Sequence, residues 1–192
     1  VDGDRLIALA ALQLRDEGRL HADTVVVTVM SNLGFHKAMV AAGIEVLTTA
    51  VGDRYVLEAL DAHGHSVGGE QSGHIIYRDV ATTGDGLLAG LRLAQFVHDG
   101  GHALAELAGG VMTSYPQVLV NVRVRERHPR VAAELSAEIE AAERSLGGDG
   151  RILVRASGTE PLIRVMVEAA TVQQAQSRGI FVGPSRKYGY DG

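Results

Sequence analysis

The sequence contains no cysteine, only four prolines and no long apolar run. Without cysteine, neither a disulfide framework nor a thiolate metal site can form, and this usage fits a reducing compartment. No apolar run approaches the ~18 residues that a membrane-spanning helix needs. No tract of lysine and arginine is present and the net charge is −5, so the electrostatic signature of a nucleic-acid-binding protein is missing. We therefore expect a cytoplasmic protein that binds neither nucleic acid nor membrane.

Apolar residues make up 46% of the 192 residues and charged residues 21%, a balance typical of a folded globular chain. The 24 glycines fall mostly at the ends of expected elements, which indicates turns and not low complexity. The chain begins Val1-Asp-Gly-Asp-Arg5, with neither an initiator methionine nor a signal peptide, and we expect it to be a piece of a longer protein.

Strand and helix patterns alternate over the first half of the chain. Strands are predicted at 24–30, 44–49 and 75–77, with a short one near Ser66, and helices at 4–17, 31–42, 53–62, 85–97 and 103–108. This order predicts a three-layer α/β/α domain over residues 1–112, with a mixed, mostly parallel sheet. Leu87, Leu88, Leu91 and Ala94 recur at helical spacing and predict an apolar face on the fourth helix.

The pattern changes at about residue 113 and predicts a smaller α+β domain over residues 113–192. Residues 117–125 alternate apolar and polar side chains as a half-buried strand does, and two more strands are predicted at 151–155 and 162–168. An apolar stripe from Val131 to Leu146 predicts one helix. A last helix is predicted over 171–177, but residues 178–192 show no amphipathic period, and we expect this atypical tail to pack poorly.

The loop between the last two predicted strands, Arg155-Ala-Ser-Gly-Thr-Glu-Pro-Leu-Ile-Arg164, gathers the strongest set of anion-binding groups. Two guanidiniums, the hydroxyls of Ser157 and Thr159, and successive backbone N–H groups are the donors that a phosphate dianion prefers. Gly158 lets the backbone approach a ligand closely. The alternative is an ordinary polar turn with surface arginines.

A second polar loop, Gly69-Glu-Gln-Ser-Gly-His74, combines groups that suit a sugar. Glu70 can accept hydrogen bonds from two sugar hydroxyls, and Ser72 can both donate and accept. His74 can move a proton near neutral pH. The alternative is a polar hairpin connection with a structural histidine.

Aspartates stand at the start of three predicted helices. In Gly52-Asp-Arg54 the helix N-terminus favours an anion, and Arg54 adds positive charge. The simpler interpretation is that Asp53 only caps the helix and that Arg54 is solvated. In Thr83-Gly-Asp-Gly86 the aspartate is also predicted to cap. Asp2-Gly-Asp-Arg5 suggests a Mg²⁺ site, but two carboxylates where a helix needs a cap are weak evidence, and we predict that this chain binds no metal.

Four motifs resemble those of the α-D-phosphohexomutase superfamily, in the same order and over residues 1 to about 177. They are Val51-Gly-Asp-Arg-Tyr-Val, Gly69-Glu-Gln-Ser-Gly-His, Thr83-Gly-Asp-Gly and Arg155-Ala-Ser-Gly-Thr-Glu-Pro. The first two are more similar to the phosphoglucosamine mutase branch than to the phosphomannomutase or phosphoglucomutase branches.

The resemblance implies a four-domain isomerase of which residues 1–112 are the third, sugar-binding domain and 113–192 the fourth, phosphate-binding domain. The implied reaction interconverts glucosamine 6-phosphate and glucosamine 1-phosphate through a phosphoserine, on the route to UDP-N-acetylglucosamine and peptidoglycan. His74 would shuttle a proton. The sugar would contact Glu70, Ser72 and Arg54, and the phosphate Arg155, Ser157, Gly158, Thr159 and Arg164.

The family's phosphoserine and Mg²⁺ loop lie in its first two domains. The resemblance therefore implies that this chain alone is inactive, and that Mg²⁺ serves only the full-length enzyme. Its partners would be a phosphosugar and the missing N-terminal domains of the same enzyme. The alternatives are a fragment of a phosphomannomutase or phosphoglucomutase, or a non-catalytic phosphosugar-binding module.

Overall fold

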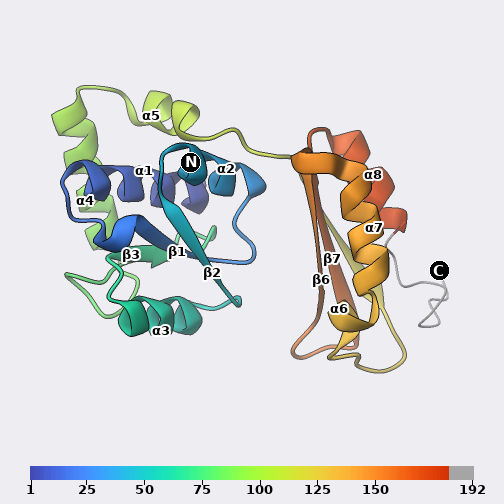
Figure 1. The fold of residues 1–192 in the computed structure, drawn as a ribbon. Coiled ribbons are helices and arrows are strands. Elements are labelled where there is room, and N and C mark those ends of the chain that lie inside the picture. The colour runs from blue at the N-terminus through green and yellow to red at the C-terminus, as the bar shows by residue number, and fades with distance from the viewer. Residues whose placement is uncertain (182–192) are drawn as a thin grey trace. The chain divides into compact units, whose positions relative to one another are not determined.

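A computed structural model describes residues 1–181 and divides the chain into two compact units, Val1–Ser114 and Tyr115–Gly192 (Figure 1). No helix among the described residues combines the length and the apolar character that crossing a bilayer requires.

The first unit is an α/β domain around a four-stranded sheet. Its elements are α1 (Gly3–Asp16), β1 (Thr24–Thr28), α2 (Leu33–Ala41), β2 (Glu45–Thr49), α3 (Asp53–His63), β3 (Val67–Gly69), β4 (Ile75–Tyr77), α4 (Gly86–Gly100) and α5 (Leu104–Val111). The strand order is β2-β1-β3-β4, with β1 parallel to both neighbours and β4 antiparallel to β3. Helices α1 and α2 lie on one side of the sheet and α3 on the other (Figure 1). The predicted mixed, mostly parallel sheet with helices on both faces is confirmed.

Strand β1 is buried on both faces, which explains its continuous apolar run. Val25 and Val27 belong to the core cluster that α1 and α2 cover, where Phe35 is also fully buried. Val26 points the other way and packs with Val56 of α3. Alternate side chains of a strand face opposite sides, so a strand between two helical layers needs apolar residues at every position.

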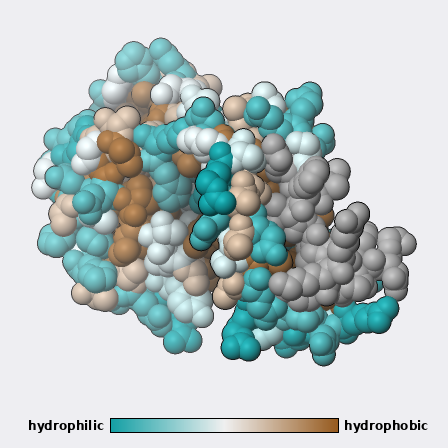
Figure 2. Space-filling view, turned by 45° about the vertical axis from the view of Figure 1, so that its right-hand side comes forward, coloured by the Kyte–Doolittle hydropathy of each residue, from teal (hydrophilic) through white to brown (hydrophobic). Residues whose placement is uncertain are grey.

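Helix α4 starts where predicted, but its predicted apolar face is only partly buried. Leu88 packs against the main core cluster, as its spacing suggests. Leu87 and Leu91 are instead 75% and 62% exposed, and Figure 2 shows that apolar side chains do reach the surface of the molecule. Helical periodicity identifies residues that share a face, but it does not reveal whether another element covers that face.

The second unit is a two-layer α+β domain. Its elements are β5 (Gln117–Arg123), α6 (Val131–Glu134), α7 (Ser136–Leu146), β6 (Gly150–Ala156), β7 (Leu162–Ala169) and α8 (Val172–Phe181). The three strands are antiparallel, in the order β5-β7-β6. Side chains from all three helices, such as Val131, Ile139 and Ala175, share one apolar cluster with Val154 and Val165 of the sheet. The described helices therefore cover the face of the sheet that Val154 and Val165 occupy.

Two helix predictions for this unit are wrong. The stripe from Val131 to Leu146 forms two helices, because Leu135 leaves the helical region at φ −111° and ψ 15°. Leu135 is still buried in the same cluster as Val131, so the apolar period continues across the break and hides it. Helix α8 continues to Phe181 and does not end near Ser177. The prediction that residues 178–192 pack poorly concerns side chains that lie outside the described ones.

Candidate functional site

The loops that follow β2 and β3 meet at Glu70. Both strands run parallel to β1, and the carboxyl ends of parallel strands open on the same edge of a sheet. The Glu70 carboxylate accepts a hydrogen bond from the Gly52 backbone N–H at 3.0 Å, which ties the two loops together. Gly73 adopts φ +96°, a left-handed conformation that favours glycine, and its N–H donates to the Glu70 carbonyl at 2.9 Å. The loop is therefore a tight turn that fixes the position of Glu70.

His74 ends this turn and lies against two other motifs. Its Nε2 atom is 3.5 Å from Oδ2 of Asp53. Gly84 packs on the ring so closely that a Cβ atom at position 84 would lie 2.3 Å from Nε2. The structure thus brings the motifs at 51–56, 69–74 and 83–86 together at one histidine.

Ser72 and Arg54 are the solvent-exposed candidates among these motifs. Ser72 is exposed. The Arg54 side chain is 80% exposed and its Nε donates to Glu58 at 2.7 Å, one helical turn further along α3. This hydrogen bond raises the pKa of Arg54 above its ordinary value. Arg54 therefore stays charged and accessible to solvent in the first turn of α3.

Asp85 and Asp53 differ in how they start their helices. Asp85 is the N-cap of α4, and its carboxylate accepts from the N–H groups of Leu87 and Leu88 at 2.9 and 3.0 Å. This confirms the predicted cap. The same prediction for Asp53 is wrong, because Gly52 occupies the N-cap position of α3 and Asp53 is the first helical residue. Asp53 Oδ1 accepts from the Arg54 backbone N–H at 2.8 Å, which leaves Oδ2 directed at His74.

The aspartates at the start of the chain do not fit a Mg²⁺ site. Asp2 is the N-cap of α1 and accepts from the Arg5 backbone N–H at 3.0 Å. Asp4 is buried and accepts from the Asn32 backbone N–H at 2.7 Å. Within residues 1–181 no group of three or more histidine, aspartate or glutamate side chains could hold a metal ion.

In the second unit, Arg155 and Arg164 form a cationic pair. They are register partners on β6 and β7, so their side chains share one face of the sheet. The Arg164 Nε atom is buried and has no hydrogen-bond partner within the described part of the chain. Burial lowers the pKa of Arg155, and the positive charge of Arg164 lowers it further. These two half-buried side chains thus place like charges opposite each other on neighbouring strands.

The loop between these arginines is held in one shape. The Ser157 backbone N–H donates to the Leu162 carbonyl at 2.8 Å, and the Ser157 hydroxyl oxygen accepts from the Glu160 N–H at 3.3 Å. The Arg127 side chain donates to the Gly158 carbonyl. Gly158 and Thr159 are exposed at the tip. The predicted donors therefore come from one short, braced turn.

Three contacts of these site residues were not predicted from the sequence. Arg127 braces the Gly158 carbonyl from outside every quoted motif, and no sequence signal marks it. Asp53 and Gly84 do stand inside quoted motifs. Their contacts with His74 depend on the sheet topology and could not be read from spacing alone.

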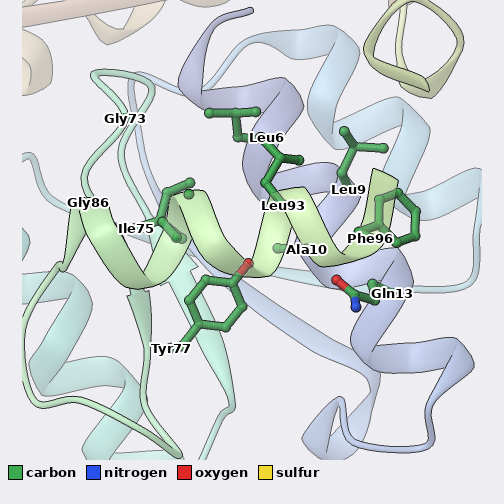
Figure 3. Close-up of a pocket in the computed structure, with 12 residues that line it drawn as sticks. Leu6, Leu9, Ala10, Gln13, Gly73, Ile75, Tyr77, Gly86, Leu93 and Phe96 are labelled. Atoms are coloured by element: carbon green, nitrogen blue, oxygen red, sulfur yellow. The ribbon is translucent and has the colours of Figure 1, made fainter. Parts of the chain in front are cut away.

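A cavity of about 170 Å³ lies between α1 and α4, bordered at one side by Gly73 and Gly86 of the polar loops (Figure 3). Its lining is largely aliphatic and aromatic, with Leu6, Leu9 and Phe96 around it and Gln13 as a polar member. Tyr77 also lines it, and burial raises the pKa of that phenol. A cavity of this size without a cationic side chain does not suit a charged phosphosugar, so we do not assign it to the candidate site.

Two family models match the chain. Phosphoglucomutase/phosphomannomutase, alpha/beta/alpha domain III, matches residues 2–115, and the phosphoglucomutase/phosphomannomutase C-terminal domain matches residues 119–178. Curated phosphoglucosamine mutases are similar to this chain over about nine tenths of its length. The protein from Streptomyces griseus is 57% identical over 178 residues, 92% of this chain and 39% of the relative, and that from Frankia alni is 59% identical over 172 residues, 89% of this chain and 38% of the relative. The chain thus spans about 39% of the length of such relatives.

Solved structures share the fold. An N-acetylphosphoglucosamine mutase from Aspergillus fumigatus superposes with a TM-score of 0.81 at 23% identity, over 97% of this chain and 43% of that one. A phosphoglucomutase/phosphomannomutase family protein from Burkholderia thailandensis gives 0.74 at 19% identity, over 100% of this chain and 43% of that one.

Proposed function

Because the chain belongs to the phosphoglucomutase/phosphomannomutase family, we propose that it is the sugar- and phosphate-recognising part of a phosphoglucosamine mutase. The full-length enzyme interconverts glucosamine 6-phosphate and glucosamine 1-phosphate in the cytoplasm. This isomerisation supplies the route to UDP-N-acetylglucosamine and peptidoglycan. The observation that carries the proposal is the pairing of Arg155 with Arg164 around a braced polar turn.

The arginine pair holds the phosphate that does not react. Two like charges directly opposite on neighbouring strands destabilise a sheet unless an anion lies between them. A phosphate dianion would supply that charge and would accept the hydrogen bond that Arg164 Nε lacks in the described chain. Ser157, Gly158 and Thr159 add hydroxyl and backbone donors from the turn. Each hydrogen bond to a charged group contributes about 1.5–3 kcal/mol.

The loop on the first unit binds the sugar. Glu70 is fixed by the Gly52 N–H and presents its remaining acceptor capacity to sugar hydroxyls. Ser72 and Arg54 are exposed beside it and add a hydroxyl and a guanidinium. His74 exchanges a proton with the reacting hydroxyl. Residues 1–112 act as the sugar-binding domain and 113–192 as the phosphate-binding domain.

The remaining chemistry comes from outside this chain. A phosphoserine in the missing N-terminal domains donates the phosphoryl group, and Mg²⁺ bound there stabilises the developing charge. A related Aspergillus fumigatus enzyme has been crystallised with GlcNAc-6P and magnesium, which supports both ligand types for the family. This chain supplies positioning and is inactive by itself.

Glucosamine is favoured as the sugar because the curated relatives named phosphoglucosamine mutase are 53–59% identical over most of the chain. A phosphomannomutase or phosphoglucomutase, or a binding module without catalysis, is the alternative. A chimera in which this chain replaces the 178 matched residues of the Streptomyces griseus relative separates them. We expect turnover of glucosamine phosphates above that of mannose and glucose phosphates. Preference for mannose or glucose phosphates would overturn the proposed substrate, and a folded chimera without any turnover would overturn the enzyme assignment.

A further inference from the structure

The carboxylate of Asp53 has no part in the proposed sugar site, yet it is aimed at the ring of His74. Its Oδ1 atom accepts from the Arg54 backbone N–H at 2.8 Å, and its Oδ2 atom lies 3.5 Å from His74 Nε2. Because Oδ1 is tied to the backbone, the orientation of the carboxylate is set by the first turn of α3. Asp53 is not the helix cap, so a capping role does not account for this placement.

The two nitrogen atoms of His74 stand in different environments. Nε2 is buried under Gly84 and makes no hydrogen bond within the described residues, so the Asp53 carboxylate is the ionic neighbour that faces it. The side chain as a whole is 36% exposed. Unlike Nε2, Nδ1 is not among the buried side-chain atoms that lack a hydrogen-bond partner within the described residues. The ring therefore has one sheltered nitrogen beside a carboxylate and one nitrogen that a ligand can reach.

We propose that Asp53 is a positioning residue that keeps the proton of neutral His74 on Nε2 and leaves the lone pair of Nδ1 open to a sugar hydroxyl. A neutral imidazole carries one proton, and the partner of one nitrogen decides the state of the other. The proposal rests on the proposed function only for the identity of that hydroxyl. The arrangement of Asp53 and His74, which we call the dyad, is a property of this chain.

The dyad also explains how His74 can take up a proton. When Nδ1 accepts the proton of the sugar hydroxyl, the oxygen keeps the bonding electron pair and the ring becomes a cation. The Asp53 carboxylate, beside Nε2, stabilises that positive charge. In the reverse direction Nδ1 returns the proton to the sugar oxygen, and the ring is again neutral with its proton on Nε2.

The substitution Asp53→Asn makes a sharp prediction about the ring. The Arg54 N–H needs an acceptor at the Oδ1 position, so the amide oxygen takes that place and the amide NH₂ group faces Nε2. An NH₂ group can only donate, which forces the ring proton onto Nδ1. Asp61→Asn is the matched control, because Asp61 lies on the same helix and carries the same charge but pairs with Arg78.

Nitrogen-15 NMR of the full chain, labelled at histidine, reports the protonated nitrogen directly. At a pH well above the ordinary histidine pKa of about 6.5, we expect the Nε2–H form of His74 in the unsubstituted chain and in Asp61→Asn. In Asp53→Asn we expect the Nδ1–H form. An unchanged His74 signal in a folded Asp53→Asn chain would overturn the dyad. Asp53→Ala, which removes the acceptor without offering a donor, should give a mixture of both forms, and a pure Nε2–H signal there would also contradict it.

Turnover by the chimera provides the second readout. Asp53→Asn should lower kcat on the order of 10²-fold, the lower end of what a general acid or base contributes. KM should stay within about twofold, because Glu70 and Ser72 still bind the sugar. Asp61→Asn should leave both unchanged. A wild-type kcat in Asp53→Asn would overturn the role in catalysis. An inactive parent chimera would instead count against the proposed function, and the ring-proton measurement would still decide the dyad.

Discussion

Arg155 and Arg164 lie directly opposite each other on β6 and β7, and both point away from the helices of their unit. Val154 and Val165, their neighbours along each strand, belong to the apolar cluster beneath the helices. Because side chains alternate along a strand, the two guanidiniums occupy the other face of the sheet. A like-charged cross-strand pair is costly without a ligand, and the buried Nε of Arg164 has no hydrogen-bond partner among residues 1–181, which makes the pair the most informative feature of the second unit.

Replacing Arg155 tests the pair as a phosphate site. Arg155→Ala should weaken binding of a phosphate ligand by about 1.5–3 kcal/mol, because a charged hydrogen bond is lost. Arg144→Ala is the control, since Arg144 is 71% exposed on α7 and pairs only weakly with Glu140 at 3.8 Å. Calorimetric titration of the full chain with glucosamine 6-phosphate measures both. Equal affinity in the two variants would mean that the loop is only a polar turn.

Glu168 ties all three strands of the second unit together from a fully buried position. Its Oε1 accepts from Gln117 on β5 at 3.1 Å, and its Oε2 accepts from Arg151 on β6 at 2.9 Å. Removing one partner of a buried ion pair typically costs about 3–5 kcal/mol. We expect Glu168→Ala to lower the free energy of unfolding by this amount, measured by chemical denaturation.

The control for Glu168 is an exposed glutamate of the same unit. Glu140 is 68% exposed, and Glu140→Ala should change the free energy of unfolding by less than about 0.5 kcal/mol. Similar losses in the two variants would show that the contacts of Glu168 with Gln117 and Arg151 do not stabilise the sheet.

Gly84 and Gly86 form a matched pair for testing the packing on His74. A Cβ atom at position 84 would meet the His74 ring at 2.3–2.6 Å, whereas one at position 86 has open space around it. Gly84→Ala should push the ring away from Asp53 and destabilise the unit by about 1–3 kcal/mol, the usual cost of overpacking. The His74 signals in NMR spectra should move strongly in Gly84→Ala and little in Gly86→Ala. If both variants leave the ring signals in place, Gly84 does not pack on the His74 ring.

His65 gives the first unit a pH-dependent stability. The residue is only 9% exposed, and burial lowers its pKa; a hydrogen bond with the His21 backbone offsets part of this shift, and the charges of His63 and His21 lower the pKa slightly further. The folded state then binds fewer protons than the unfolded state, so the free energy of unfolding falls as the pH drops below the unfolded pKa of about 6.5. His65→Phe should reduce this slope, and His98→Gln, at an exposed position, should not. Denaturation at a series of pH values measures both, and a slope unaffected by His65→Phe would contradict the assignment.

Much of the fold was predictable because the apolar pattern follows the sheet. Val25, Val26 and Val27 form a continuous run since helices cover both faces of β1, and short β4 was predicted at its observed bounds. The break at Leu135 was not predictable, because both flanking helices bury the same stripe. The exposure of Leu87 was not either, since a sequence period cannot show what covers a helix.

The candidate sites of the two units differ in the same way. Arg155 and Arg164 flank a single turn between adjacent strands, so their proximity follows from local spacing. Asp53 begins the helix after β2 and His74 ends the turn after β3, and only the strand order brings them together. Long-range contacts of this kind leave no periodic signal in the sequence.

The most direct test of the phosphate site observes the two guanidiniums while ligand is added. In NMR spectra of the full chain, the Nε–H signals of Arg155 and Arg164 should shift in a saturable way with glucosamine 6-phosphate. Inorganic phosphate should produce a similar shift, and glucosamine without phosphate should produce none. Because the chain provides only two of the family's domains, we expect saturation at high ligand concentration. Signals that stay unmoved by glucosamine 6-phosphate, or that respond equally to glucosamine, would contradict the claim that this pair holds the phosphate.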